Sequence, residues 1–285
     1  MFVNIMLEHN NINAGIPDVH YRASALSVEE NEVLSKVADY FSDKLKVAGD
    51  VLKVNMNRVI DNITPSNMSS SELRKTKSAI EDIQSKVKYN NVSAVEIPVT
   101  LGMKKDLYSS LSDILYVFDT MVKDVPEAID KLDEVSSKML SNNDFKKSGR
   151  PFKDTGVTKM ADELQDTLNK LIDPNGVNDR MPVSKLLPNL SSLTEIVEML
   201  DKLSILTDKK HLKKIMAQSK GISNNIDYLY EEYQKNNTEV KKERLVELGY
   251  YLENTAKAVT AYVSVIHLIS QFSDTLNHIL KTLDK

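Results

Sequence analysis

Apolar residues near the end of the chain recur at alternating steps of three and four. Steps of this kind place an apolar seam along one face of a helix. No Gly or Pro follows Gly249, so we expect one continuous helix from about Thr238 to Leu283. At 1.5 Å of rise per residue, this helix would be about 65–70 Å long. The seam consists of Leu245, Leu248, Leu252, Thr255, Val259, Tyr262, Ile266, Ile269, Ser273, Leu276, Leu280 and Leu283.

Shorter helical patterns precede this segment. Ser27-Val28-Glu29-Glu30 forms a capping box, and the apolar positions after it predict a long helix that ends before Pro65. Earlier residues have no steady period and contain Asn, Gly and Pro, which favours an extended arm. We therefore predict an all-α, elongated multi-helix bundle with a long C-terminal helix. Its predicted segments are an N-terminal arm (1–26), an N-terminal helical region (27–142), a flexible loop (143–157) and a C-terminal helical region (158–285).

Local signals predict several helix boundaries. Pro126 can be accommodated in a first helical turn, and we expect a kink there between two closely spaced helices. Ser192 and Glu195 have the spacing of another capping box. Asp208 precedes a short basic helix that we expect to end at Gly221.

Two other segments favour non-helical structure. Residues 92–101 contain Pro98 and alternate only in part, which predicts an extended connector or a lone edge strand. No second strand run is evident, so we do not expect a sheet. Asp173-Pro174-Asn175-Gly176 is a strong turn signal.

Composition supports a helical protein with an ordinary core. The 285 residues are 41% hydrophobic and include only 8 Gly and 8 Pro, fewer than turn-rich folds use. The net charge of −4 gives no overall attraction to nucleic acid or to an anionic membrane. The chain has no Cys, which excludes disulfides, Cys-based zinc sites and thiol catalysis.

Two apolar stretches raise the question of a membrane. The first residues, Met1–Glu8, lack a basic leader and make a poor signal peptide. Ala258–Ser273 is the least charged stretch, but about sixteen residues are too few to span hydrocarbon. A buried bundle helix is the favoured interpretation, and a segment that leaves the bundle to enter a membrane is the alternative.

Familiar catalytic motifs are missing from the sequence. No His follows a Glu by three residues, as a helical di-iron site would need, and no His-Glu-x-x-His occurs. His267 and His278 would lie about 16 Å apart along one helix, too far to share a metal. Glu195, Glu198 and Asp201 are typical of a solvated helix face. We predict no catalytic, cofactor-binding or metal-binding residues, and no enzyme.

Two sets of residues are candidates for binding partners. An apolar run at the N-terminus and a late cluster of tyrosines favour contacts with other protein subunits. Two basic clusters could contact phosphate or an acidic partner, although no interleaved aromatic residues support single-strand nucleic-acid binding. The partner-binding candidates are Phe2, Val3, Ile5, Met6, Leu7, Tyr228, Tyr230 and Tyr233, and the basic candidates are Lys146, Lys147, Arg150, Lys153, Lys209, Lys210, Lys213 and Lys214.

The features together favour a non-enzymatic structural or assembly protein that acts through protein–protein contacts in a homo- or hetero-oligomeric complex. An internal or neck-region component of a phage virion is one concrete version, which would place the chain in a virion or the cytoplasm. Two alternatives stay open. One is a helical pore-forming or membrane-active protein, and the other is a regulatory or inhibitory binding module.

Overall fold

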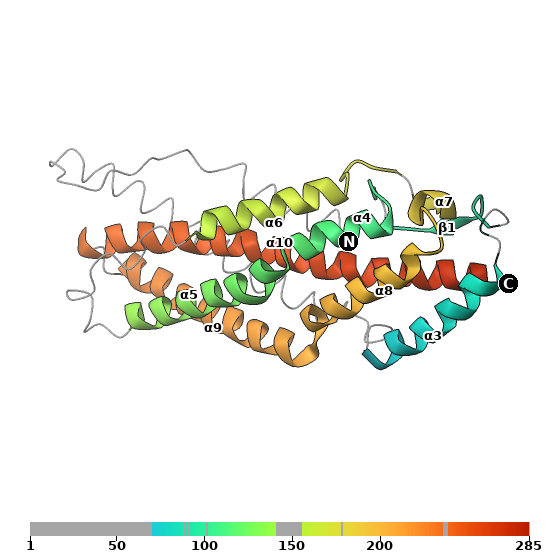
Figure 1. The fold of residues 1–285 in the computed structure, drawn as a ribbon. Coiled ribbons are helices and arrows are strands. Elements are labelled where there is room, and N and C mark those ends of the chain that lie inside the picture. The colour runs from blue at the N-terminus through green and yellow to red at the C-terminus, as the bar shows by residue number, and fades with distance from the viewer. Residues whose placement is uncertain are drawn as a thin grey trace. The chain divides into compact units, whose positions relative to one another are not determined.

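The computed structural model describes residues 70–87, 89, 92–100, 102–140, 156–177, 179–235 and 239–284. The fold in this part is all-α with one small sheet, which confirms the predicted fold class (Figure 1). The elements in chain order are α3 (Ser70–Lys86), β1 (Glu96–Pro98), α4 (Leu107–Tyr116), the π-helical turn η2 (Thr120–Asp124), α5 (Val125–Leu140), α6 (Val157–Leu171), β2 (Arg180–Pro182), α7 (Val183–Leu186), α8 (Ser192–Leu203), the 3₁₀ turn η3 (Ser204–Thr207), α9 (Lys209–Lys235) and α10 (Glu239–Leu283).

The chain divides into two compact units. Unit 1 includes Asp124–Asp162 and Lys214–Thr260, and unit 2 includes Glu163–Lys213 and Ala261–Lys285 together with the chain around β1 and α4. The predicted arm, the helix after Ser27 and most of the predicted loop lie outside the described residues. The predicted segments and the predicted elongation stay predictions.

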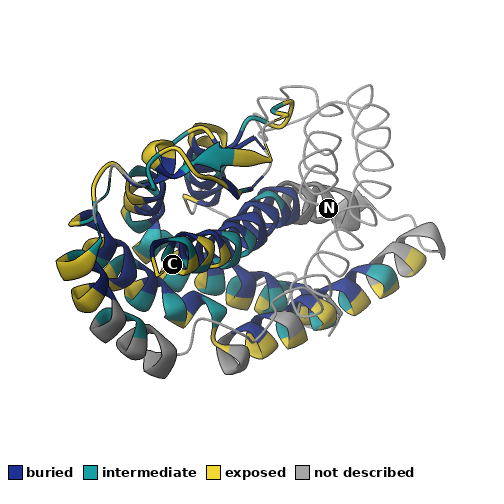
Figure 2. Cartoon of the chain, turned by 90° about the vertical axis from the view of Figure 1, so that its right-hand side faces the viewer, coloured by how far each residue is buried: buried dark blue, intermediate teal, exposed yellow. Residues whose placement is uncertain are grey.

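The long C-terminal helix is confirmed. α10 is a continuous helix of 45 residues. Every residue from Tyr251 to Ile266 except Lys257 is buried, so this part of the helix has no open face. In Figure 2, dark blue runs along the helix that ends at the mark C. The predicted seam is therefore only part of a helix that is buried on all sides here, because apolar residues also fill the positions between the seam residues.

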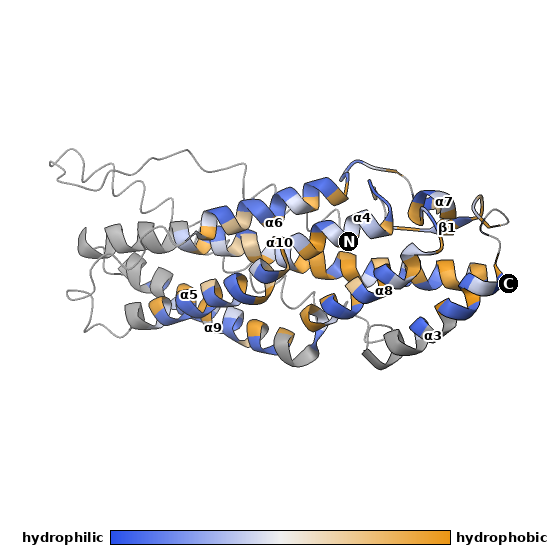
Figure 3. Cartoon of the chain, in the orientation of Figure 1, coloured by the Kyte–Doolittle hydropathy of each residue, from blue (hydrophilic) through white to orange (hydrophobic). Residues whose placement is uncertain are grey.

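The other helices have an apolar and a polar side, as their periodicity predicts. In Figure 3 the visible side of α6 is largely blue, and its orange residues lie toward one edge. The buried residues of α6 include Val157, Met160, Ala161, Leu164, Leu168 and Leu171, which recur at helical spacing. Lys159, Asp162 and Asp166 lie on its exposed side. Each such helix buries one apolar stripe.

The prediction of no sheet is wrong. β1 pairs antiparallel with β2, with Ile97 opposite Met181. Only three residues pair in each strand, and each strand contains a proline. Such short runs carry too little alternation to mark a strand in the sequence. The pairing of β1 with β2 can therefore be seen only in the three-dimensional structure.

A tight turn lies beside this sheet and confirms the predicted Asp173–Gly176 signal. The Gly176 amide donates to the Asp173 carbonyl at 2.9 Å, and the Asp173 amide donates to the Gly102 carbonyl at 2.8 Å. Gly102 has φ +75°, and a Cβ there would lie 2.1 Å from the Asp173 carbonyl oxygen. Only glycine fits this close backbone crossing.

Helix boundaries correct two further predictions. α9 passes through Gly221 without ending, because Ser219, Ile222 and Ile226 around it are buried. Tertiary burial there exceeds the cost of about 1 kcal/mol that an internal glycine brings. At α8 the predicted capping box is also wrong, since Asn189 Oδ1 accepts from the Ser192 amide at 3.0 Å.

Pro126 lies in the first turn of α5, as predicted, and the predicted kink at this residue stays a prediction. The irregular geometry precedes it as a π-helical turn over Thr120–Asp124. A π turn inserts an extra residue into a helix and rotates the residues after it.

Candidate protein-binding surface

Many of the residues singled out in the sequence lie outside the described structure. This holds for Phe2, Val3, Ile5, Met6, Leu7, Lys146, Lys147, Arg150 and Lys153. The side chains of Tyr230, Tyr233, Lys209 and Lys210 are also outside the described part, although their backbone belongs to α9. Their roles stay predictions.

The remaining candidates lie on exposed positions of α9. Tyr228 is 55% exposed, and Lys213 and Lys214 are exposed as well. Lys214 Nζ lies 3.9 Å from Asp130 Oδ2 on α5. Asp130 also accepts a hydrogen bond from Gln218. The acidic neighbour on α5 thus offsets part of the positive charge of this predicted basic cluster.

Among the described residues, four groups have a shifted pKa, and each has a local cause. Burial raises the pKa of Tyr89, which donates to the Leu187 carbonyl, and of Tyr262 in α10. Burial lowers the pKa of His267, while the Asp274 charge opposes that shift. A hydrogen bond and the charge of Glu195 raise the pKa of Tyr108. In the described ranges, no group of three His, Asp or Glu side chains is arranged to hold a metal.

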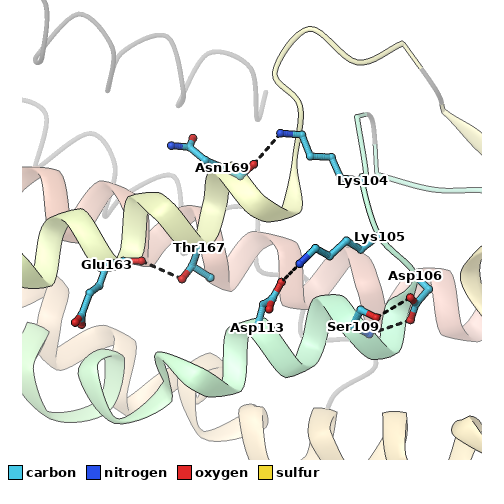
Figure 4. A network of polar contacts seen from close by, with 8 residues as sticks. All are labelled: Lys104, Lys105, Asp106, Ser109, Asp113, Glu163, Thr167 and Asn169. Carbon is cyan, nitrogen blue, oxygen red and sulfur yellow. Dashed lines mark hydrogen bonds and ion pairs between the residues drawn. The ribbon is translucent and has the colours of Figure 1, made fainter.

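A set of polar contacts fixes the start of α4 (Figure 4). Asp106 caps the helix by accepting from the Ser109 amide at 2.9 Å and from its hydroxyl at 2.7 Å. Lys105 pairs with Asp113 at 2.5 Å, and Lys104 donates to the Asn169 carbonyl of α6 at 2.7 Å. Both ends of the Lys105–Asp113 pair are about one-third exposed. These contacts position α4 against α6.

The helices α4 and α8 pack through an apolar core. Leu107, Leu111 and Ile114 on α4 are fully buried, as are Ile196 and Leu200 on α8. On the other flank of α8, Gln84 of α3 donates to the Leu190 carbonyl at 2.8 Å, and Lys77 pairs with Glu198 at 3.2 Å. α8 is therefore held on both flanks.

An exposed strip follows the line where α4 meets α8. Along α4 it contains Tyr108, Ser112 and Tyr116, which are spaced four residues apart and share one side of the helix. Tyr108 is 37% exposed and Tyr116 is 85% exposed. Along α8 it contains Glu195, Met199 and Lys202. We call these six residues the α4–α8 strip.

Three contacts across the strip show that the two helices run parallel. Glu195 accepts a hydrogen bond from the Tyr108 hydroxyl, and the Ser112 hydroxyl lies 3.7 Å from the Met199 sulfur. Farther along, Lys202 Nζ lies 5.4 Å from the centroid of the Phe118 ring. These contacts hold the strip in a defined geometry while its two tyrosines stay open to solvent.

The strip has the chemistry of a protein-binding surface. Tyrosine and methionine are enriched at protein interfaces, where tyrosine offers a large apolar body and a polar tip. Sequence analysis placed Glu195 on a solvated face and did not single out Tyr108 or Tyr116. The signal present was the i, i+4, i+8 row of Tyr108, Ser112 and Tyr116 opposite the apolar row of α4.

Comparison with models of protein families, with curated proteins and with solved structures finds no match for this chain.

Proposed function

We propose that this chain is a non-catalytic helical protein that acts by binding other protein chains, and that the α4–α8 strip is its contact surface. The supporting observation is the exposed pair of tyrosines. Tyr116 stays 85% exposed on a helix that buries Leu107, Leu111 and Ile114 completely. Tyrosine has only two side-chain torsions, so it binds a partner with little loss of conformational freedom.

The ordered backbone beneath the strip supports the same proposal. Asp106 caps α4, and α8 is held by contacts with both α3 and α4. A surface on such helices is available without rearrangement, which lowers the entropic cost of association. Assembly into a larger particle, such as a phage virion, extends this proposal and rests on the sequence pattern alone.

The alternatives receive no separate support. No helix in the described part of the chain combines the length and apolarity needed to cross a membrane. The regulatory interpretation rested on basic clusters, of which Lys213 and Lys214 are exposed and lie on α9. Both alternatives stay predictions from the sequence.

Site-specific photo-crosslinking in the native cell tests the proposal. A photoreactive phenylalanine analogue replaces Tyr116 in one variant and Val177 in a control, because both residues are 85% exposed. We expect a discrete heavier product, containing a second protein chain, from position 116 and not from position 177. Equal or absent crosslinking at the two positions would contradict the proposal.

A further inference from the structure

The α4–α8 strip has an internal symmetry in its chemistry. Tyr108 and Tyr116 lie four residues on either side of Ser112, while Glu195 and Lys202 flank Met199 at nearly equal steps. The two midpoints touch, since the Ser112 hydroxyl lies 3.7 Å from the Met199 sulfur. The α4 side of the strip thus has a tyrosine at each end. The α8 side has a negative charge at one end and a positive charge at the other.

We propose that the strip binds the same strip of a second copy of this chain, about a two-fold axis that crosses both helices at the Ser112–Met199 contact. This inference rests on the proposed function and names its partner. A two-fold interface brings one patch against itself and reverses its direction along the helices. Strip residues at one end then meet residues at the other end of the second copy.

The reversal produces complementary contacts at every level of the strip. Glu195 of one copy faces Lys202 of the other, and this pairing occurs twice because of the symmetry. Tyr108 faces Tyr116, and Met199 faces itself at the centre. At 1.5 Å of rise per residue, Tyr108 and Tyr116 are about 12 Å apart along α4, and Glu195 and Lys202 are about 10 Å apart along α8. Because the two spacings are similar, the charge pairs and the tyrosine pairs can form in the same dimer.

Two ion pairs within the chain flank the strip. Lys77 pairs with Glu198 at 3.2 Å on the side of α3, and Lys105 pairs with Asp113 at 2.5 Å on the far side of α4. Glu195 and Lys202 form no ion pair with another described residue. Within the chain Glu195 interacts with the Tyr108 hydroxyl and Lys202 lies over the Phe118 ring, so a second copy would supply the opposite charge that each of them lacks.

The size of the strip sets the expected strength. Six side chains cover less than the roughly 800 Å² per partner of a standard stable interface. We expect a weak, reversible dimer that forms as the concentration rises. Because two charge pairs contribute, we also expect added salt to weaken it.

Charge exchange in the full chain tests the two-fold arrangement, with mass measured by sedimentation over a concentration series. We expect the wild type to double in mass. Glu195→Lys and Lys202→Glu each create two like-charge contacts, and we expect each to weaken the dimer by about tenfold or more. The double variant restores both pairs. An equimolar mixture of the two single variants also restores both pairs. In the mixed dimer, one copy has lysine at both positions and the other copy has glutamate at both.

The controls separate folding from association. Lys185→Glu replaces an exposed lysine on α7 and changes the net charge by the same amount as Lys202→Glu. We expect it to have no effect on the mass measured by sedimentation. Circular dichroism checks that each variant keeps its helical content and melting temperature. A wild type that stays monomeric at every concentration, or single variants that mix without forming a dimer, would overturn the inference.

The same data distinguish this inference from the proposed function. A monomeric wild type whose position 116 still crosslinks to a different protein refutes only the second copy as partner. If the wild type dimerises but neither charge variant nor Tyr116→Ala weakens the dimer, the two copies contact each other elsewhere. This outcome also overturns the inference. Absence of any specific crosslink at position 116 refutes the proposed function itself.

Discussion

The two longest helices of the described part of the chain, α10 and α9, differ in how they are buried. α10 is covered on all sides from Tyr251 to Ile266, except at Lys257. α9 buries one stripe, whereas Lys213, Ala217 and Lys220 on its other sides are exposed. A helix with an open side can place its polar groups in water, whereas a helix without one must find partners for them inside the protein.

The buried hydroxyl groups show this difference directly. On α10, Thr255 donates to the Tyr251 carbonyl and Thr260 donates to the Ala256 carbonyl, each at 2.8 Å. On α9, the buried hydroxyls of Ser219 and Ser223 have no hydrogen-bond partner among the residues that the structure describes. The branched threonine side chain has few rotamers, and one of them directs its hydroxyl to the carbonyl of the preceding turn. The all-round burial of α10 is thus tolerated through local satisfaction of its polar groups.

The largest effect should come from breaking the ion pair within α10. Glu253 and Lys257 pair at 2.5 Å, with side chains only 10% and 21% exposed. Glu253→Ala leaves the Lys257 ammonium without its counter-charge, and we expect it to lower the free energy of unfolding by about 2–3 kcal/mol. Chemical denaturation followed by circular dichroism measures this change.

Lys214→Ala on α9 is the matched control for this prediction. It removes a pair with Asp130 whose side chains are 65% and 49% exposed. We expect a loss below about 1 kcal/mol, because water screens an exposed pair. Equal losses in the two variants would contradict the contrast between the helices.

A second effect should follow from adding volume. Ala258 on α10 is completely buried, whereas Ala217 on α9 is exposed. We expect Ala258→Leu to destabilise the protein by about 1–3 kcal/mol, since close-packed neighbours must move. Ala217→Leu should change stability by less than about 0.5 kcal/mol. Thermal unfolding of both variants checks the pair, and tolerance of leucine at Ala258 would show an open face on α10.

The sequence was sufficient to identify α10 but not its environment. The seam from Leu252 to Leu276 predicted one helix because each residue of that pattern can be placed without knowing the rest of the fold. Apolar residues off the seam, such as Ala258, Ala261 and Val265, were also visible. They indicate burial on further sides, yet which elements cover those sides depends on packing between distant segments.

Features that join distant segments could not be predicted. β1 and β2 are three residues each and are separated in the sequence by α4, α5 and α6. The α4–α8 strip likewise combines Ser112 with Met199, and neither residue carries a signal for the other. The spacing of Tyr108 and Tyr116 on one side of α4 was visible in the sequence. Their position beside Glu195, Met199 and Lys202 of α8 depends on tertiary structure.

A smaller pair of effects should have opposite signs. Thr260→Val keeps the shape of the side chain and removes its hydrogen bond, so we expect a loss of about 0.5–1 kcal/mol. Ser219→Ala removes an unpartnered buried hydroxyl, and we expect a gain of up to about 1 kcal/mol. Ser85→Ala is the comparison at an exposed position of α3, where the change gains helix propensity but also removes a solvent-exposed hydrogen bond to the Asp82 carbonyl. A Ser219→Ala gain no larger than the Ser85→Ala gain would indicate that Ser219 does have a partner.

The smallest effect should be a change in the pH dependence of stability, because α10 also contains a partly buried histidine. Burial lowers the pKa of His267, whereas His278 is exposed. The unfolded chain therefore binds a proton at a higher pH than the folded chain does. Stability is fully present above the ordinary histidine pKa of about 6.5 and is lost as the pH falls toward the lower folded value.

His267→Gln should make this loss shallower. The free energy of unfolding, measured by denaturation between about pH 7.5 and about pH 5.5, compares this variant with the wild type across the ordinary histidine range. A slope that does not change in His267→Gln would mean that His267 titrates alike in the folded and unfolded chain. In that case α10 would be open to water at this position, and the contrast with α9 would hold only for the turns before it.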